Sequence, residues 1–261
     1  MLFYKAWIET RARFVAGLIA AAIICIFYME QHAWLVRMWT ADMQNPHGYH
    51  MKWMPLGIHE YSWYLWHYLY NNYLQQVWAL FAILFAFGGL VRERNGGTAL
   101  FSLGLPVSRR RWLFTRLTVA LLESIALSLF AVLVVVIGSA VIHQTYSLSQ
   151  LLLHSALMVA AGVFIVALGN LCYTLFPGNY LSLILTLALL GAPYLWIQTY
   201  MQHMRYLGRT PWFRYLDLAH TMAGPWQLNW STMPWLPLLV AWLLTAALFA
   251  ATVAHGDRLD Y

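Results

Sequence analysis

The sequence RERNGGTALFSLGLPVSRRRWLFTR, residues 92–116, is a long polar interruption of apolar runs that carries a dense cluster of charge. Gly96 and Gly97 are expected to end the helix before it, and Ser108 to cap a new helix that continues into the next apolar run. A short crosswise helix is predicted between these points. The stretch has a single acid, Glu93, against six arginines: Arg92, Arg94, Arg109, Arg110, Arg111 and Arg116.

The composition around this stretch is that of an integral membrane protein. Of the 261 residues, 62% are hydrophobic and only 9% are charged, whereas charged residues make up about 25% of an ordinary soluble domain. The net charge of +6 suits lipid headgroups and membrane sorting. Binding of nucleic acid is not expected, because the chain lacks the basic face that it requires.

The apolar runs predict an all-α, polytopic membrane protein with six transmembrane helices. A helix of about 20 apolar residues crosses a bilayer, and the predicted spans are 14–28, 69–91, 117–142, 151–176, 180–200 and 235–253. Residues 30–68 and 201–234 are expected to form external segments, and the apolar pattern that resumes near residue 59 is long enough for the second span to project from the membrane or break.

Residues 1–13 are expected to form an interfacial helix before the first span. Lys5, Glu9 and Arg13 recur on one face, and apolar side chains occupy the other, which is typical of a helix lying at the membrane surface. Placing this helix inside the cell puts ten lysines and arginines in internal segments and five in external ones. The positive-inside rule therefore favours an N-in, C-in orientation.

The order of residues within 93–109 resembles the signature of the type-2 ATP-binding-cassette (ABC) permeases. The similarity covers about seventeen residues, and the six-span layout extends it over the chain. In that family the segment is a coupling helix that lies in a groove of a cytoplasmic ATPase. The resemblance assigns ATPase coupling to the segment 92–116, through Glu93, Gly97, Thr98, Leu103, Leu105, Pro106, Ser108, Arg109, Arg110 and Arg111.

The resemblance implies the membrane subunit of an ABC exporter in the cell membrane, with a second permease subunit, identical or different, two ATPases and membrane lipids as partners. A phosphate-binding P-loop requires a glycine followed by lysine, and neither Lys5 nor Lys52 follows a glycine. The chain is therefore not expected to be an enzyme or to bind a cofactor itself. ATP and Mg²⁺ are expected in the partner ATPase.

Three polar residues inside predicted spans are candidates for a substrate path or for gating: Glu123, Ser128 and Asn170. A carboxylate in the membrane must face protein or water, so Glu123 either pairs with an arginine near the cytoplasmic edge or serves substrate or gating. For Ser128 the alternative is a hydroxyl bonded to its own helix. For Asn170 it is a hydrogen bond between helices.

Histidine and methionine side chains gather in the predicted external segments. The closest group is His47, His50, Met51 and Met54, and such ligands suit copper. The alternative is an interfacial layer of polar and soft apolar residues without metal. An autonomous secondary carrier or a metal-handling membrane protein is the main rival function, and a membrane anchor for a soluble enzyme is another.

Overall fold

A computed structural model of the chain describes residues 2–44, 56–87, 109–176, 180–206 and 215–258. Nearly all of these residues are helical, and the described ranges contain no strand. Five of the helices are long and apolar enough to cross a membrane. The chain is therefore an all-helical protein with the character of a multi-pass membrane protein.

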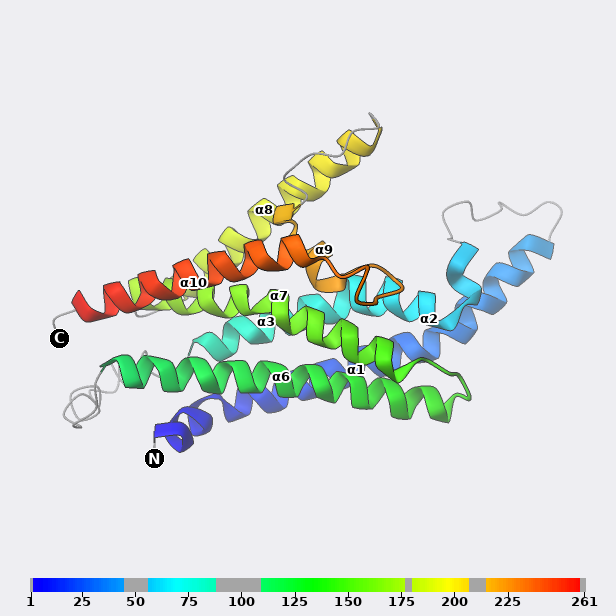
Figure 1. Cartoon of the computed structure of the whole chain (residues 1–261). Coiled ribbons are helices and arrows are strands. Elements are labelled where there is room, and N and C mark those ends of the chain that lie inside the picture. The colour runs from blue at the N-terminus through cyan, green and yellow to red at the C-terminus, as the bar shows by residue number, and fades with distance from the viewer. Residues whose placement is uncertain (1, 45–55, 88–108, 177–179, 207–214, 259–261) are drawn as a thin grey trace.

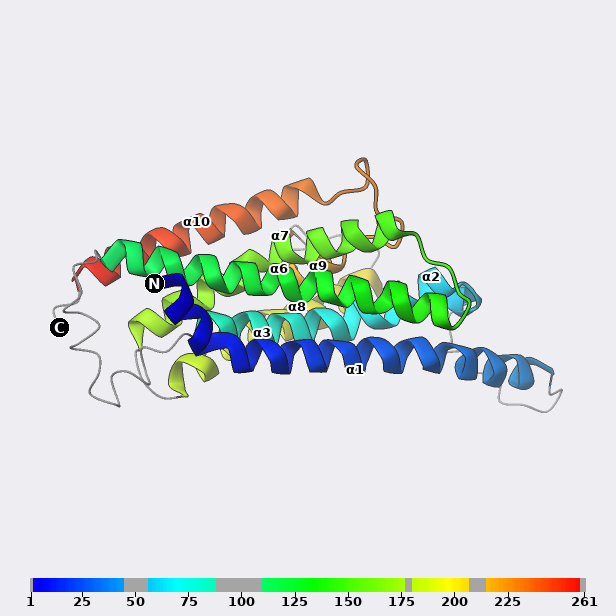
Figure 2. The ribbon, with the colours of Figure 1, turned by 90° about the horizontal axis from the view of Figure 1, so that it is seen from below.

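Helix α1, Leu2–Gln44, is a single helix of 43 residues, or about 65 Å at 1.5 Å per residue. The predicted span 14–28 lies within this helix, which also includes the expected interfacial segment and the first part of the expected external one. Its first turns lie at an angle to the rest (Figure 2). No glycine or proline follows Gly17 until Pro46, so nothing in the sequence stops the helix at residue 28.

The segment 56–86, which runs back through the bundle, changes helix type along its length. It begins with the 3₁₀ turn η1, Leu56–His59, and continues as α2, Tyr61–Tyr64, the π-helix η2, Leu65–Leu74, and α3, Gln75–Ala86. Leu69, Leu74 and Trp78 are buried here. The predicted span 69–91 lies in this region, but α3 ends at Ala86, where Phe87 leaves helical geometry.

The remaining spans coincide with helices. They are α6, Arg109–Val141, α7, Leu148–Leu175, α8, Leu181–Tyr206, and α10, Trp235–Arg258, with the short helix α9, Leu218–Ala223, between the last two. Helix α6 continues from Arg109 into the apolar run, as expected, and the expected cap, Ser108, lies outside the described residues. The second external segment is helical at its start, since α8 continues through residue 206.

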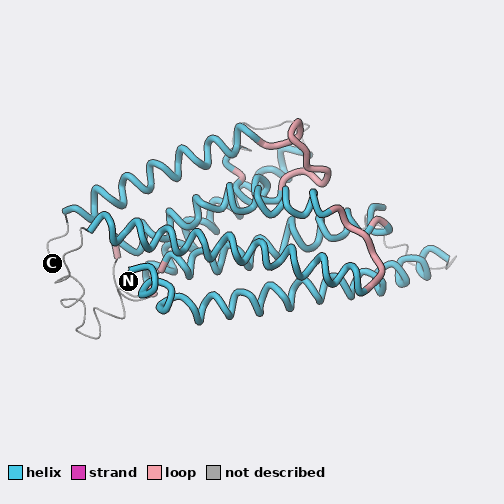
Figure 3. Tube along the Cα trace, turned by 60° about the horizontal axis from the view of Figure 1, so that its bottom comes forward, coloured by secondary structure: helices cyan, strands magenta, loops and turns pink. Residues whose placement is uncertain are grey.

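Helices α3 and α7 form the centre of the bundle, and α1, α6, α8, α9 and α10 pack around them. Figure 3 shows the long helices running side by side along the bundle. The contact is close at Gly162 of α7, where a Cβ atom would lie 2.1 Å from the ring of Trp78. Only glycine admits the Trp78 indole at this position. The indole nitrogen donates a hydrogen bond to the backbone oxygen of Ser124 on α6, at 2.9 Å, so the ring joins three helices.

The helices alternate in direction along the bundle. The start of α1, the end of α3 and the start of α6 lie at one end, together with the end of α10 (Figure 1). We call this the N-terminal end. The surfaces of α8 and α10 carry many exposed leucines and tryptophans, including Leu195, Trp196 and Leu243, as expected of helices that face lipid.

Candidate functional site

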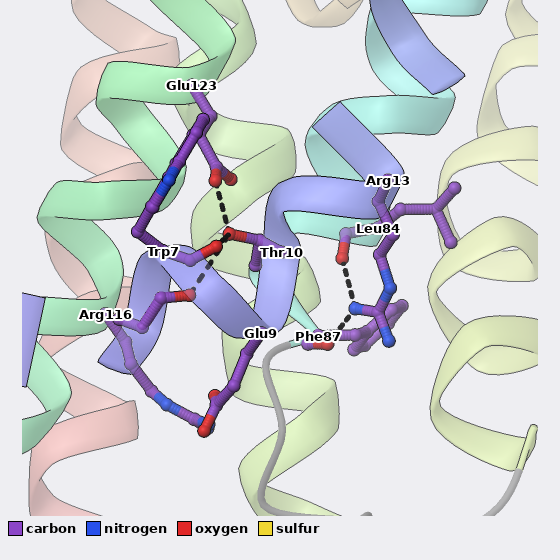
Figure 4. Close-up of polar contacts among 9 residues, drawn as sticks. Trp7, Glu9, Thr10, Arg13, Leu84, Phe87, Arg116 and Glu123 are labelled. Atoms are coloured by element: carbon purple, nitrogen blue, oxygen red, sulfur yellow. Dashed lines mark hydrogen bonds and ion pairs between the residues drawn. The ribbon is translucent and has the colours of Figure 1, made fainter. Parts of the chain in front are cut away.

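Polar side chains of α1 face the bundle at its N-terminal end (Figure 4). Glu9, Thr10 and Arg13 each contact α3 or α6. Phe3 and Trp7 are exposed instead, by 54% and 39%. The charged stripe of the predicted interfacial helix therefore packs against protein, and its aromatic side chains point outward.

Glu9 and Arg116 form an ion pair between α1 and α6. Arg116 Nη2 lies 2.6 Å from Glu9 Oε2, and the two side chains are only 14% and 16% exposed. The guanidinium also stacks over the Trp112 ring, with 4.0 Å between its central carbon and the ring centroid. Such a cation–π contact strengthens when water is excluded, so Arg116 is held in place from two sides.

Glu123 is buried on the same face of α6 as Arg116, seven residues earlier, and it contacts Thr10 of α1. The Thr10 hydroxyl donates a hydrogen bond to Glu123 Oε1 and also lies 3.1 Å from the backbone oxygen of Ala6. Because the Thr10 hydroxyl has a single hydrogen, it donates to only one of these two oxygens at a time. Glu123 Oε2 has no hydrogen-bond partner among the described residues. Arg116, the arginine on the same face of α6, pairs with Glu9 instead of with Glu123.

Arg13 caps the end of α3. Its Nη1 donates hydrogen bonds to the backbone oxygens of Leu84, at 2.8 Å, and of Phe87. The last carbonyls of a helix have no partner within it, and an apolar bundle offers them no water. A cation at this position is also attracted by the partial negative charge at the C-terminal end of the helix. Arg13 therefore fixes the point at which the chain leaves α3.

These contacts connect both flanks of residues 88–108 to one helix. Arg13 holds the last turn of α3, while Glu9 and Thr10 hold Arg116 and Glu123 on α6. We call Glu9, Thr10, Arg13, Arg116 and Glu123 the α1 clamp. A displacement of the end of α3 or of the first turns of α6 must either move α1 with it or break contacts of this clamp.

Most residues expected to couple to an ATPase lie outside the described part of the chain: Glu93, Gly97, Thr98, Leu103, Leu105, Pro106 and Ser108. Arg109 begins α6, and Arg110 and Arg111 lie exposed in its first turn. The segment is thus followed at once by an exposed basic helix start. Its own contacts stay a prediction.

The other candidates are not brought together with Glu123. The Ser128 hydroxyl lies 2.5 Å from that of Ser155 on α7, so it joins two helices instead of bonding to its own. Ser124 does bond to its own helix, through the oxygen of Ala120 at 2.8 Å. Asn170 is buried in α7, and its backbone oxygen accepts a hydrogen bond from Thr174 at 2.6 Å.

The proposed metal ligands His47, His50, Met51 and Met54 also lie outside the described residues. Within the described ranges, no group of three or more histidines, cysteines or acids is arranged to hold a metal ion. His32 and His154, both buried, contact backbone oxygens instead: His32 Nε2 lies 2.9 Å from the oxygen of Ile58, and His154 Nδ1 lies 3.0 Å from that of Ala223.

A second polar attachment, at the other end of the bundle, was not anticipated from the sequence. The Gln150 amide of α7 donates to the backbone oxygen of Leu228, at 2.8 Å, and accepts from its nitrogen, at 3.0 Å. Together with His154 it holds the segment after α9 against α7. The only feature of the sequence that indicates this attachment is a polar pair, Gln150 and His154, spaced by about one helical turn in an apolar run.

Comparison with known proteins identifies no relative for this chain. No family model matches the sequence, and neither the curated proteins nor the solved structures contain a significant match.

Proposed function

We propose that this chain is the permease subunit of an ATP-driven ABC transporter, coupled to a separate ATPase through residues 92–116. The observation that carries the proposal is the α1 clamp, which connects both flanks of that segment to one long helix. In an apolar bundle, side chains of this polarity are costly unless they are paired. Their position beside a predicted docking segment is what force transmission requires.

The proposal includes six membrane passes, with the continuous helical path from α2 through α3 as the second. It also places the N-terminal end of the bundle in the cytoplasm. Basic residues gather at this end in α1 and at the start of α6, at Lys5, Arg11, Arg13, Arg110, Arg111 and Arg116, as the positive-inside rule requires. A second permease subunit, outward transport and residence in the cell membrane complete the proposal and derive from the resemblance of residues 93–109.

Purification of the full chain from its native membranes in mild detergent tests the proposal. We expect ATP hydrolysis to copurify with the chain and to be lost when Leu103 and Leu105 are both replaced by Asp. The control is Leu148→Asp at the start of α7, an exposed leucine at the opposite end of the bundle. Its activity is expected to match that of the unmodified chain.

Two outcomes contradict the proposal. The first is an unmodified chain that transports no substrate in an ATP-dependent manner and carries no ATPase, which favours the autonomous carrier. The second is ATPase that copurifies equally with the Leu103→Asp, Leu105→Asp variant and the control, which places the motor at some other surface.

A further inference from the structure

Glu123 is a buried carboxyl group, and the arginines of the α1 clamp bind other partners. Its side chain is 3% exposed, and it lies seven residues, or about 10 Å, beyond Arg116 along α6. Arg116 pairs with Glu9, and Arg13 donates to backbone oxygens at the end of α3. Among the described residues, Glu123 has one hydrogen bond, between Oε1 and the Thr10 hydroxyl, and its Oε2 has none.

The surroundings of Glu123 offer little to balance a negative charge. The titratable side chains near it are Glu9 and Arg13 of α1, Arg116 of α6 and, beside Arg13, Tyr173 of α7. Arg13 is near enough to attract a charge on Glu123, but its guanidinium is directed at the last turn of α3 (Figure 4). A charged side chain inside a bilayer is costly unless it is paired, so these contacts favour an uncharged carboxyl group.

The hydrogen bonds of Thr10 point to the same conclusion. Its hydroxyl has one hydrogen and two oxygens within reach, Glu123 Oε1 and the backbone oxygen of Ala6, at 3.1 Å. If Glu123 is ionised, that hydrogen serves only one of the two oxygens, and a buried charge is left on the carboxylate. If Oε1 carries a proton, it donates to the Thr10 oxygen, and the Thr10 hydrogen is free for Ala6. Both contacts are then hydrogen bonds, and Oε2 is an uncharged carbonyl oxygen.

We propose that Glu123 is a proton-binding site, which holds a proton at neutral pH while α1 packs on α6 and whose O–H group donates to Thr10. When the two helices separate, that O–H bond breaks, the proton passes to water, and a carboxylate remains. Packing of α1 on α6 therefore binds a proton, and a rise in pH weakens this packing. Because these contacts lie within one chain, the proposal does not depend on an ATPase partner.

Infrared spectroscopy of the full-length chain in lipid nanodiscs at neutral pH tests the proposal. An ordinary glutamate, with a pKa of about 4.3, is ionised under these conditions. The wild-type spectrum minus that of Glu123→Gln is expected to contain the carbonyl stretch of a protonated carboxyl group, and Thr10→Val is expected to shift this band. The matched control is Glu9→Gln, at the acid that pairs with Arg116, for which the difference spectrum is expected to contain only carboxylate bands.

Thermal unfolding at several pH values, followed by tryptophan fluorescence, gives a second measurement. The unfolded chain releases the proton above a pH of about 4.3, so unfolding becomes more favourable as the pH rises. Relative to Glu123→Gln, the wild-type Tm is therefore expected to fall by about 3–5 °C per pH unit between about pH 5 and 7.

The glutamine amide donates to Thr10 as a neutral carboxyl group does, so Glu123→Gln is expected to fold. If it does not, the wild-type spectrum decides, because a chain without a protonated carboxyl band at neutral pH refutes the proposal. A difference spectrum with only carboxylate bands, an unshifted band in Thr10→Val, or the same pH dependence of Tm in both chains also overturns it. All of these measurements are made on the isolated chain, so failure here leaves the proposed transport function standing.

Discussion

Replacing Arg13 with Met tests whether the α1 clamp holds the end of α3. The change keeps an apolar stem and removes the guanidinium that donates to the backbone oxygens of Leu84 and Phe87. Hydrogen bonds from a charged donor contribute about 1.5–3 kcal/mol, and buried carbonyls left without a partner add a penalty. We therefore expect a loss of about 2 kcal/mol in the free energy of unfolding.

The two free cysteines provide the assay. Cys25 and Cys172 are buried, with 0% and 2% exposure, so a thiol-reactive fluorescent dye labels them only as the detergent-solubilised chain unfolds. For a chain of this size, about 1 kcal/mol shifts Tm by about 2–4 °C. Arg13→Met is thus expected to unfold about 4–8 °C below the unmodified chain, a shift that follows from the loss of about 2 kcal/mol.

Two further variants decide how the result is interpreted. Arg11→Met makes the same change at an exposed arginine two residues away and is expected to leave Tm nearly unchanged. Arg13→Lys keeps the charge but loses the planar fork that reaches two carbonyls, so its Tm is expected to fall between the other two. Equal Tm values for Arg13→Met and Arg11→Met refute the role given to Arg13.

Two other predictions concern packing and the opposite end of the bundle. Gly162→Ala is expected to destabilise the chain by about 1–3 kcal/mol because its Cβ meets the Trp78 ring. Gly191→Ala, whose Cβ lies in open space, is expected to stabilise the chain by about 0.5–1 kcal/mol. The same thiol assay compares the two variants, and equal shifts in Tm contradict the packing described. Gln150→Leu removes both hydrogen bonds to Leu228. It is expected to lower the free energy of unfolding by about 1–3 kcal/mol and to increase protease cleavage between residues 224 and 234. An unchanged cleavage rate argues against this attachment.

Much of the helical layout follows from the sequence because it depends on local properties. The runs 117–142, 151–176, 180–200 and 235–253 each contain enough apolar residues for a membrane helix, and each coincides with a described helix. The extension of α1 to Gln44 was not predicted, because residues 30–68 were expected to form an external segment. The absence of glycine and proline between Gly17 and Pro46 favours such a continuous helix.

The side chains of the candidate site were less predictable because their partners are distant in sequence. Spacing placed Glu9 and Arg13 on one face of a helix, but an amphipathic pattern does not say whether water or protein covers the polar face. Arg13 binds backbone oxygens more than 70 residues away, and backbone acceptors leave no signal in residue identity. The seven-residue spacing of Arg116 and Glu123, by contrast, is enough to place them on a shared face of α6.

The length of α1 gives the contacts at its beginning a mechanical meaning. From Arg13 to Gln44 the helix continues for 31 residues, about 47 Å, so a tilt of about 5° at the clamp displaces the far end by about 4 Å. Under the proposed function, a pull on the chain between α3 and α6 would be converted, by simple leverage, into motion at the opposite end of the bundle. A pair of spin labels on Met38 and Leu148 would measure that stroke directly.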